Sequence, residues 1–168
     1  RIIETTVVDA VIDLYMDSPL TSKNFLMEML TGEPNFMRHY NHIAFQSYFV
    51  NPNMLETMDK LRFDCYRLGV VREHIDEMEP VLRNSDLLSF DISAIQRAAA
   101  PSNYLSPNGL DGEDACQLSR FAGMSPALST FGIYGYTVEN DIQQLTAKQI
   151  AQMLWYFVDG IWQGKHEA

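Results

Sequence analysis

Apolar residues recur every three or four positions along most of this chain, which is the spacing of an amphipathic helix. The segment 145–164 shows this most clearly and opens with the capping-box pattern of Thr146 and Gln149. The apolar residues that follow at helical intervals are Ile150, Met153, Leu154, Phe157, Val158, Ile161 and Trp162. We therefore expect a long helix that ends near Gly164.

Proline and glycine divide the rest of the chain into shorter segments with a similar periodicity. The expected helices lie within residues 1–17, 21–31, 34–50, 54–78, 97–100 and 115–122. Together with the last helix, this pattern predicts an all-α fold. It would be a helical bundle of roughly seven to eight helices, in a single domain that spans residues 1–168.

Two segments do not follow the helical period. Residues 101–114 hold two prolines and two glycines, which predicts an irregular loop long enough to act as a lid or a flexible insert. Residues 128–138 are rich in aromatic and β-branched side chains, and leave a strand, a loop or a broken helix open. We therefore expect an irregular segment near 101–138.

The last helix carries a second apolar stripe, formed by Ala147, Ala151, Trp155 and Val158. A helix with two adjacent apolar faces needs two partners, one of which is its own core. The other is a second subunit or a deeper layer of the same core, because a tryptophan face is too large to leave in water. We favour a homodimer, and the expected interface residues are Ala151, Trp155, Val158 and Trp162.

Composition narrows the class of protein further. The 168 residues are 46% hydrophobic and 20% charged, as in an ordinary folded domain. A net charge of −10 opposes binding of phosphate backbones by this domain itself. No apolar run reaches the roughly 18 residues of a membrane span and no signal peptide is evident, so we expect a cytoplasmic protein without a membrane partner. Cys65 and Cys116 form neither a disulfide framework nor a zinc motif.

Aromatic residues and nine methionines are numerous for a helical domain. Tyrosine and tryptophan join an apolar body to a polar tip, and methionine packs adaptably, which suits a small-molecule pocket. Ordinary core packing is the alternative for each residue. We expect a cavity for a small apolar or aromatic effector, lined by Tyr40, His42, Phe45, Tyr66, Met153 and Phe157.

Catalytic and metal-binding patterns are weak. His39 and His42 would share one face of the expected third helix, but a metal would need two further donors. Glu73, His74 and Glu77 could supply them from the neighbouring helix. The sequence has no Gly-x-Ser-x-Gly elbow, phosphate loop or dinucleotide motif, and Cys65 lies on an apolar stripe. We expect no catalytic residue, no metal and no cofactor.

The segment 145–164 resembles a C-terminal helix of TetR-type transcriptional regulators. The matching residues are Ala151, Leu154, Trp155, Val158, Asp159, Gly160, Ile161 and Trp162. Residues 32–62 are similar to that family's pair of helices joined by a short Asn-Pro corner. The resemblance implies the effector-binding and dimerisation domain of a bacterial one-component regulator. Effector binding would then shift the DNA affinity of an N-terminal helix-turn-helix that this chain lacks.

Two other functions stay open at this point. Residues 67–82 have a passing similarity to the corner after a globin's haem-ligating helix, although Cys65 stands at the histidine position. That would make the chain a stand-alone helical cofactor-binding protein, a haem-type sensor. The other is a helical enzyme with a lid at 101–138.

Overall fold

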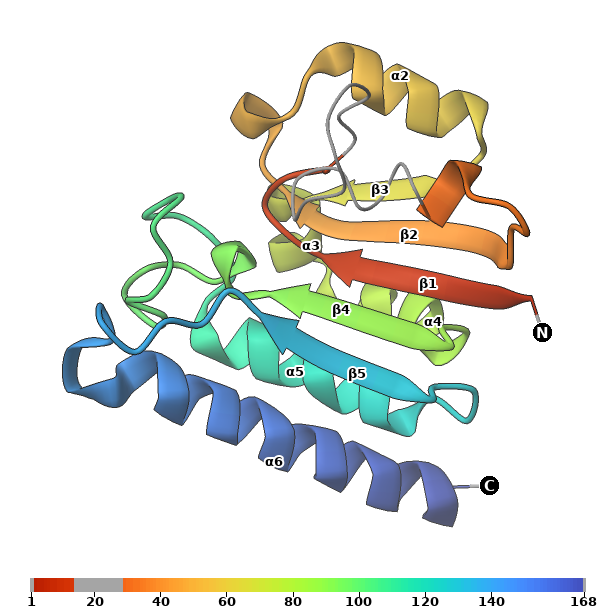
Figure 1. The fold of residues 1–168 in the computed structure, drawn as a ribbon. Helices are drawn as coiled ribbons and strands as arrows, with labels where there is room; N and C mark the ends of the chain where they lie inside the picture. The colour runs from red at the N-terminus through yellow and green to blue at the C-terminus, as the bar shows by residue number, and fades with distance from the viewer. Residues whose placement is uncertain (1, 14–28, 168) are drawn as a thin grey trace.

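The computed structural model describes residues 2–13 and 29–167 and is built around a five-stranded parallel sheet (Figure 1). The strands are β1 (Ile3–Val8), β2 (Met37–Phe45), β3 (Asp64–Arg67), β4 (Leu87–Asp91) and β5 (Thr130–Tyr134). Their order across the sheet is β3-β2-β1-β4-β5, and every neighbouring pair is parallel. The chain therefore builds from β1 to one edge and then returns to the other side of β1.

Helices lie between β2 and β3, between β3 and β4 and between β4 and β5, as parallel pairing requires, and a long helix follows β5. They are α2 (Pro52–Lys60), α3 (Leu68–Glu73), α4 (Met78–Arg83), α5 (Gly112–Met124) and α6 (Leu145–His166). Side-chain caps begin two of them: Asn51 accepts from the backbone N–H of Asn53 at α2, and Asp111 accepts from that of Asp114 at α5. Short 3-10 helices lie at Ser47–Phe49, Ile75–Glu77, Ile92–Ala94 and Ile142–Gln144.

The sheet separates two hydrophobic cores, because successive strand residues point to opposite faces. Val7 packs in a smaller core that includes Met58 of α2. Val8 packs in the larger core, where α3, α4, α5 and α6 contribute side chains such as Leu82 and Met153. Figure 1 shows α2 on one side of the sheet and α5 and α6 on the other. The carboxyl ends of the strands are thus held between two packed layers.

The predicted all-α bundle is wrong. Residues 1–17 and 34–50, both interpreted as helices, contain β1 and β2, and the expected helix over 54–78 is divided by β3. β1 and β2 carry buried side chains on both faces, so apolar residues occur without strict alternation and match a helical period by chance. The helices expected at 115–122 and 145–164 are confirmed as α5 and α6, and β5 lies within 128–138, where a strand was one of the open choices.

One face of α6 packs on α5, while the opposite face is open to solvent in the single chain. Met153 and Gly160 are buried, whereas Trp155, Val158 and Trp162 are 64%, 62% and 61% exposed. Ala151 lies on the same exposed stripe.

None of the described helices is both long enough and apolar enough to cross a membrane.

The homodimer through this stripe stays a prediction. At ~150 Å² for each exposed tryptophan, the three large side chains present roughly 400 Å² of apolar surface, about half of one partner's share in a standard interface. We expect the double variant Trp155→Glu/Val158→Glu to elute later than the parent in size-exclusion chromatography, because charges in the stripe would prevent pairing. The matched control is Ile2→Glu/Leu61→Glu, which adds the same charge at exposed apolar positions away from α6. Identical elution of the parent and the α6 variant would contradict the dimer.

Candidate functional site

The topology of the sheet marks a place where a ligand is expected to bind. From β1 the chain crosses to β2 on one side, and from β4 it crosses to β5 on the other, so the chain leaves the carboxyl ends of β1 and β4 in opposite directions. In open parallel sheets the crevice at such a switch point is the usual ligand site. Asp9 directly follows β1 and Asp91 ends β4, and the pairing of Val8 with Phe90 sets the two aspartates next to each other.

Ser93 connects the two carboxylates. Its hydroxyl donates to Oδ1 of Asp9 at 2.9 Å, and its backbone N–H donates to Oδ1 of Asp91 at 2.8 Å. The backbone N–H of Val11 also donates to Oδ1 of Asp9, at 3.0 Å. Because Asp91 caps the 3-10 helix Ile92–Ala94, the first turn after β4 holds Ser93 against β1.

Burial and like charge change the ionisation of this pair. Asp9 is only 7% exposed, and burial, the Asp91 carboxylate and then the Asp13 carboxylate raise the pKa of Asp9 to about 8. Burial likewise raises the pKa of Asp91. Two neighbouring carboxylates in a poorly hydrated site cannot both ionise easily. At neutral pH Asp9 therefore keeps its proton, and burial makes Asp91 harder to ionise than an exposed aspartate.

His42 fixes the backbone beneath Asp9. Its Nε2 lies 2.9 Å from the carbonyl oxygen of Asp9, and its Nδ1 lies 2.7 Å from the hydroxyl of Tyr40. Burial lowers the pKa of His42 to about 4, so the ring is neutral at pH 7. A neutral ring that donates from Nε2 to the carbonyl accepts from the tyrosine at Nδ1. His42 is thus a positioning residue for Asp9.

The loop after β4 is pinned over the carboxyl end of β2. Gln46 donates from Nε2 to the carbonyl of Asn108 at 3.0 Å and accepts from the hydroxyl of Ser106 at 3.0 Å. Asn103 donates to the carbonyl oxygens of Ile95 and Ser106. The irregular segment predicted at 101–114 is confirmed as a loop up to the start of α5. It is not a free insert, because its buried polar side chains anchor it to the rest of the fold.

The six residues predicted to line one cavity lie on both faces of the sheet. Tyr40 and Phe45 belong to the smaller core, and His42 contacts both of them through its ring. On the other face are Tyr66, Met153 and Phe157. The structure brings Tyr40 and His42 close to Asp9. It does not bring the residues on one face of the sheet together with those on the other face in one cavity.

Two other polar residues named in the sequence analysis, His39 and Asp159, have partners in the structure. His39 lies 2.8 Å from the Asp64 carboxylate at the surface, and Asp159 pairs with Arg120 at 3.6 Å. Within residues 2–13 and 29–167, no group of three or more His, Cys, Asp or Glu side chains is arranged to hold a metal ion. Asp9, Asp91 and Ser93 were not predicted from the sequence. The signal that could have found them is an acidic residue at the end of an apolar, β-branched run.

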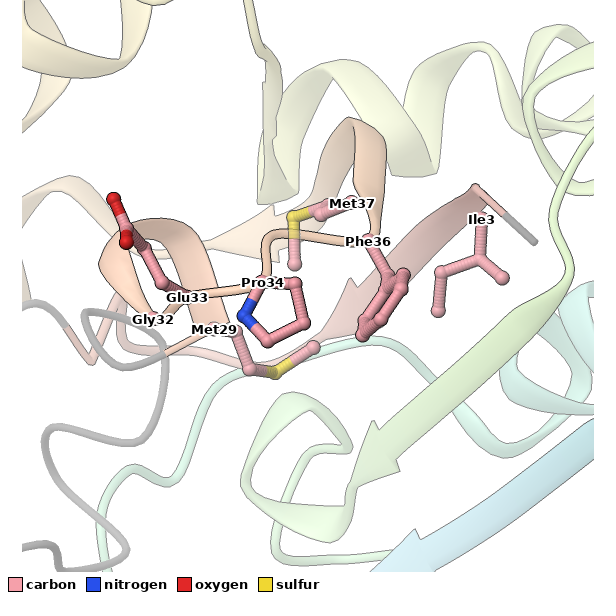
Figure 2. A pocket seen from close by; sticks show the side chains of 7 residues that line it. All are labelled: Ile3, Met29, Gly32, Glu33, Pro34, Phe36 and Met37. Atoms are coloured by element: carbon pink, nitrogen blue, oxygen red, sulfur yellow. The ribbon is translucent and has the colours of Figure 1, made fainter.

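A hollow of about 260 Å³ lies at the opposite end of β1, beside Ile3, Phe36 and Met37. Figure 2 shows Phe36, Pro34 and Met29 turned toward one another there, with the Glu33 carboxylate directed away. Ligand sites usually combine an apolar wall with a few converging polar groups. This hollow lacks such groups among the residues shown, so we place the candidate site at the carboxyl ends.

No protein-family model matches the sequence, and no curated protein is significantly similar to it. Solved structures do share its fold. Formimidoylglutamase from Bacillus subtilis subsp. subtilis str. 168 superposes with a TM-score of 0.81 at 18% identity, covering 94% of this chain and 52% of that one. Trypanosoma cruzi formiminoglutamase with Mn²⁺₂ has a TM-score of 0.79 at 17% identity, covering 95% of this chain and 56% of that one. Helicobacter pylori arginase has a TM-score of 0.75 at 14% identity, covering 95% of this chain and 65% of that one.

These similarities show an arginase-like α/β fold, and this chain spans about half the length of the first structures. They overturn the TetR resemblance, which rested on segments 145–164 and 32–62. The predicted regulator function is wrong as well, because it depended on that resemblance and on a helical fold. The haem-type sensor and the helical enzyme are wrong as well, because both require a helical fold.

Proposed function

We propose that this chain binds a small cationic nitrogen compound, an amidine or a guanidine, at the carboxyl ends of β1 and β4, where Asp9 and Asp91 are neighbours. The observation that carries the proposal is the pairing of two carboxyl groups at the switch point of the sheet, joined through Ser93. The ligand class follows from the chemistry of that pair, and the neighbours' names support it.

The geometry suits a planar cation. The N–H groups of Val11 and Ser93 and the Ser93 hydroxyl are directed at the Oδ1 atoms, so we expect a ligand to approach the Oδ2 atoms. Two acceptors from neighbouring strands match the parallel N–H donors of an amidinium or guanidinium group. The neighbours are named for formimidoylglutamate, which carries an amidine, and for arginine, which carries a guanidine.

The charge of the site favours a cation in exchange for a proton. Because the pKa of Asp9 is raised to about 8, a proton occupies the pair at neutral pH. An amidinium or guanidinium ion would stabilise both carboxylates in their ionised form and release that proton. Binding should therefore be accompanied by proton release that diminishes as the pH rises above 8.

Isothermal titration calorimetry of the chain with L-arginine, N-formimidoyl-L-glutamate and guanidinium chloride tests this proposal. The titrations are measured at pH 7 in two buffers that differ in ionisation enthalpy. At least one of these probes should bind with release of up to about one proton. Asp9→Asn should weaken that binding by about 10-fold or more and abolish the proton release. The matched control is Asp76→Asn, which removes an exposed carboxylate far along the chain and should bind as the parent does.

Two results would count against the proposal. One is the absence of heat with all three probes. The other is binding that Asp9→Asn leaves unchanged, since the carboxyl pair would then have no part in it.

A further inference from the structure

We infer that this chain keeps the sheet of the manganese-containing structures it resembles, that the residues described in the structure lack the ligands of a two-manganese centre, and that Ser93 occupies the position where a metal site would need a further carboxylate. The inference concerns the same pair of carboxyl groups as the proposed function. It rests on the donor atoms present there and does not require the amidine or guanidine ligand.

The donor set does not fit two divalent ions. Manganese prefers about six ligands, mostly carboxylate, imidazole and water, and two ions a few ångströms apart need several bridging anions. Within the described ranges the carboxyl ends of β1 and β4 offer the carboxylates of Asp9 and Asp91, with Asp13 near enough to act on Asp9 electrostatically. No third His, Cys, Asp or Glu side chain completes a metal-binding group with them in the part of the chain described.

Neighbouring residues reinforce this conclusion. Val11, between Asp9 and Asp13, offers an aliphatic side chain with no donor atom. The hydroxyl of Ser93 is a neutral donor and already bonds to Asp9 at 2.9 Å. His42, the nearest imidazole beneath Asp9, uses both ring nitrogens on the Asp9 carbonyl and on Tyr40. Hydrogen bonds therefore fix Asp9 and Asp91 in place, whereas in a metal centre the carboxylates would be fixed by the charge of the ions.

The position of Ser93 makes the inference testable by gain of function. Its Oγ lies within hydrogen-bond distance of the Asp9 carboxylate, and its N–H is bound to Asp91, so a carboxylate at this position would join the other two. In Ser93→Asp the three carboxylates would repel one another without metal. A divalent cation would relieve that repulsion and stabilise the folded chain.

Thermal unfolding of the full chain with and without millimolar MnCl₂ is the first measurement. We expect the parent Tm to be unchanged by Mn²⁺, and that of Ser93→Asp to be lower without metal and raised by about 5 °C or more with it. Ser93→Ala is the matched control, because it loses the hydroxyl without adding charge and should be destabilised yet indifferent to Mn²⁺. Metal analysis after gel filtration should find no Mn²⁺ retained by the parent.

A parent chain that retains two Mn²⁺ ions, and loses them in Asp9→Asn and Asp91→Asn, would overturn the inference. Ser93→Asp that folds but does not respond to Mn²⁺ would overturn the role given to position 93. These outcomes are independent of the calorimetric test above. Failure of the arginine and formimidoylglutamate titrations would remove the proposed function and leave this inference intact.

Discussion

The free energy of unfolding is expected to fall by about 2 kcal/mol as the pH rises from 6.5 to 8, because Asp9 keeps a proton in the folded chain that it loses on unfolding. Folded Asp9 titrates at about 8, whereas an unfolded aspartate titrates near 3.8. Between these values the folded state binds more protons than the unfolded state. Stability from this group is therefore fully present at low pH and is lost as the pH rises through 8.

His42 has the opposite effect over a lower range. Its pKa is about 4 when folded and 6.5 when unfolded, so below 6.5 the unfolded state binds the extra proton. Its contribution to stability is present above pH 6.5 and is lost as the pH falls through 4. Between pH 4 and 6.5 the two groups change the free energy of unfolding in opposite directions. Between pH 6.5 and 8 only Asp9 of the two contributes.

Urea unfolding at several pH values between 6 and 9 measures this slope. The groups that act on Asp9 are Asp91 and Asp13, by charge, and Ser93 and Val11, by hydrogen bonds. Asp9→Asn should make stability nearly independent of pH above 6.5, because the asparagine has no proton to lose. His42→Gln should keep the loss of stability above 6.5 and change only the acid side. Equal slopes for the parent and Asp9→Asn above pH 6.5 would show that Asp9 ionises normally.

The two longest amphipathic helices were predictable from the sequence, because α5 and α6 each have one face in the core. The strands were not. β2 contains His39, Asn41 and His42 among its apolar residues, and the buried polar ones are satisfied by neighbours in the sheet that no local pattern reveals. β3 has only four residues, too few for a period to be evident.

The candidate site was hidden for a different reason. Asp9 and Asp91 are far apart in the sequence. Asp9 alone has the appearance of a solvated acid on the helix expected over 1–17, and Asp91 lies between two expected helices. They become neighbours only when β1 and β4 pair, which requires knowledge of the strand order. Ser93 gains its role from the same pairing. A family resemblance based on the helix-like patterns of 145–164 and 32–62 carried none of this information, because such patterns occur in many folds.

Gly160→Ala is expected to destabilise the chain by about 3 kcal/mol or more, because the backbones of α5 and α6 touch at this position. An added Cβ would lie 2.2 Å from the carbonyl oxygen of Arg120. The same close approach recurs at Gly123 of α5, where a Cβ would lie 2.1 Å from the carbonyl oxygen of Phe157. A Cβ cannot rotate away and a carbonyl in a helix is held by its own hydrogen bonds, so the helices must separate and lose core contacts.

Gly69→Ala in α3 separates this effect from helix propensity. Nothing lies within 4 Å of a Cβ at Gly69, so alanine there should stabilise the chain by up to about 1 kcal/mol. Propensity alone predicts the same gain at Gly160, since both glycines are helical. A loss at Gly160 beside a gain at Gly69 in chemical unfolding would therefore measure the cost of moving α6 away from α5. Equal gains at both positions would show that the two helices are not in backbone contact.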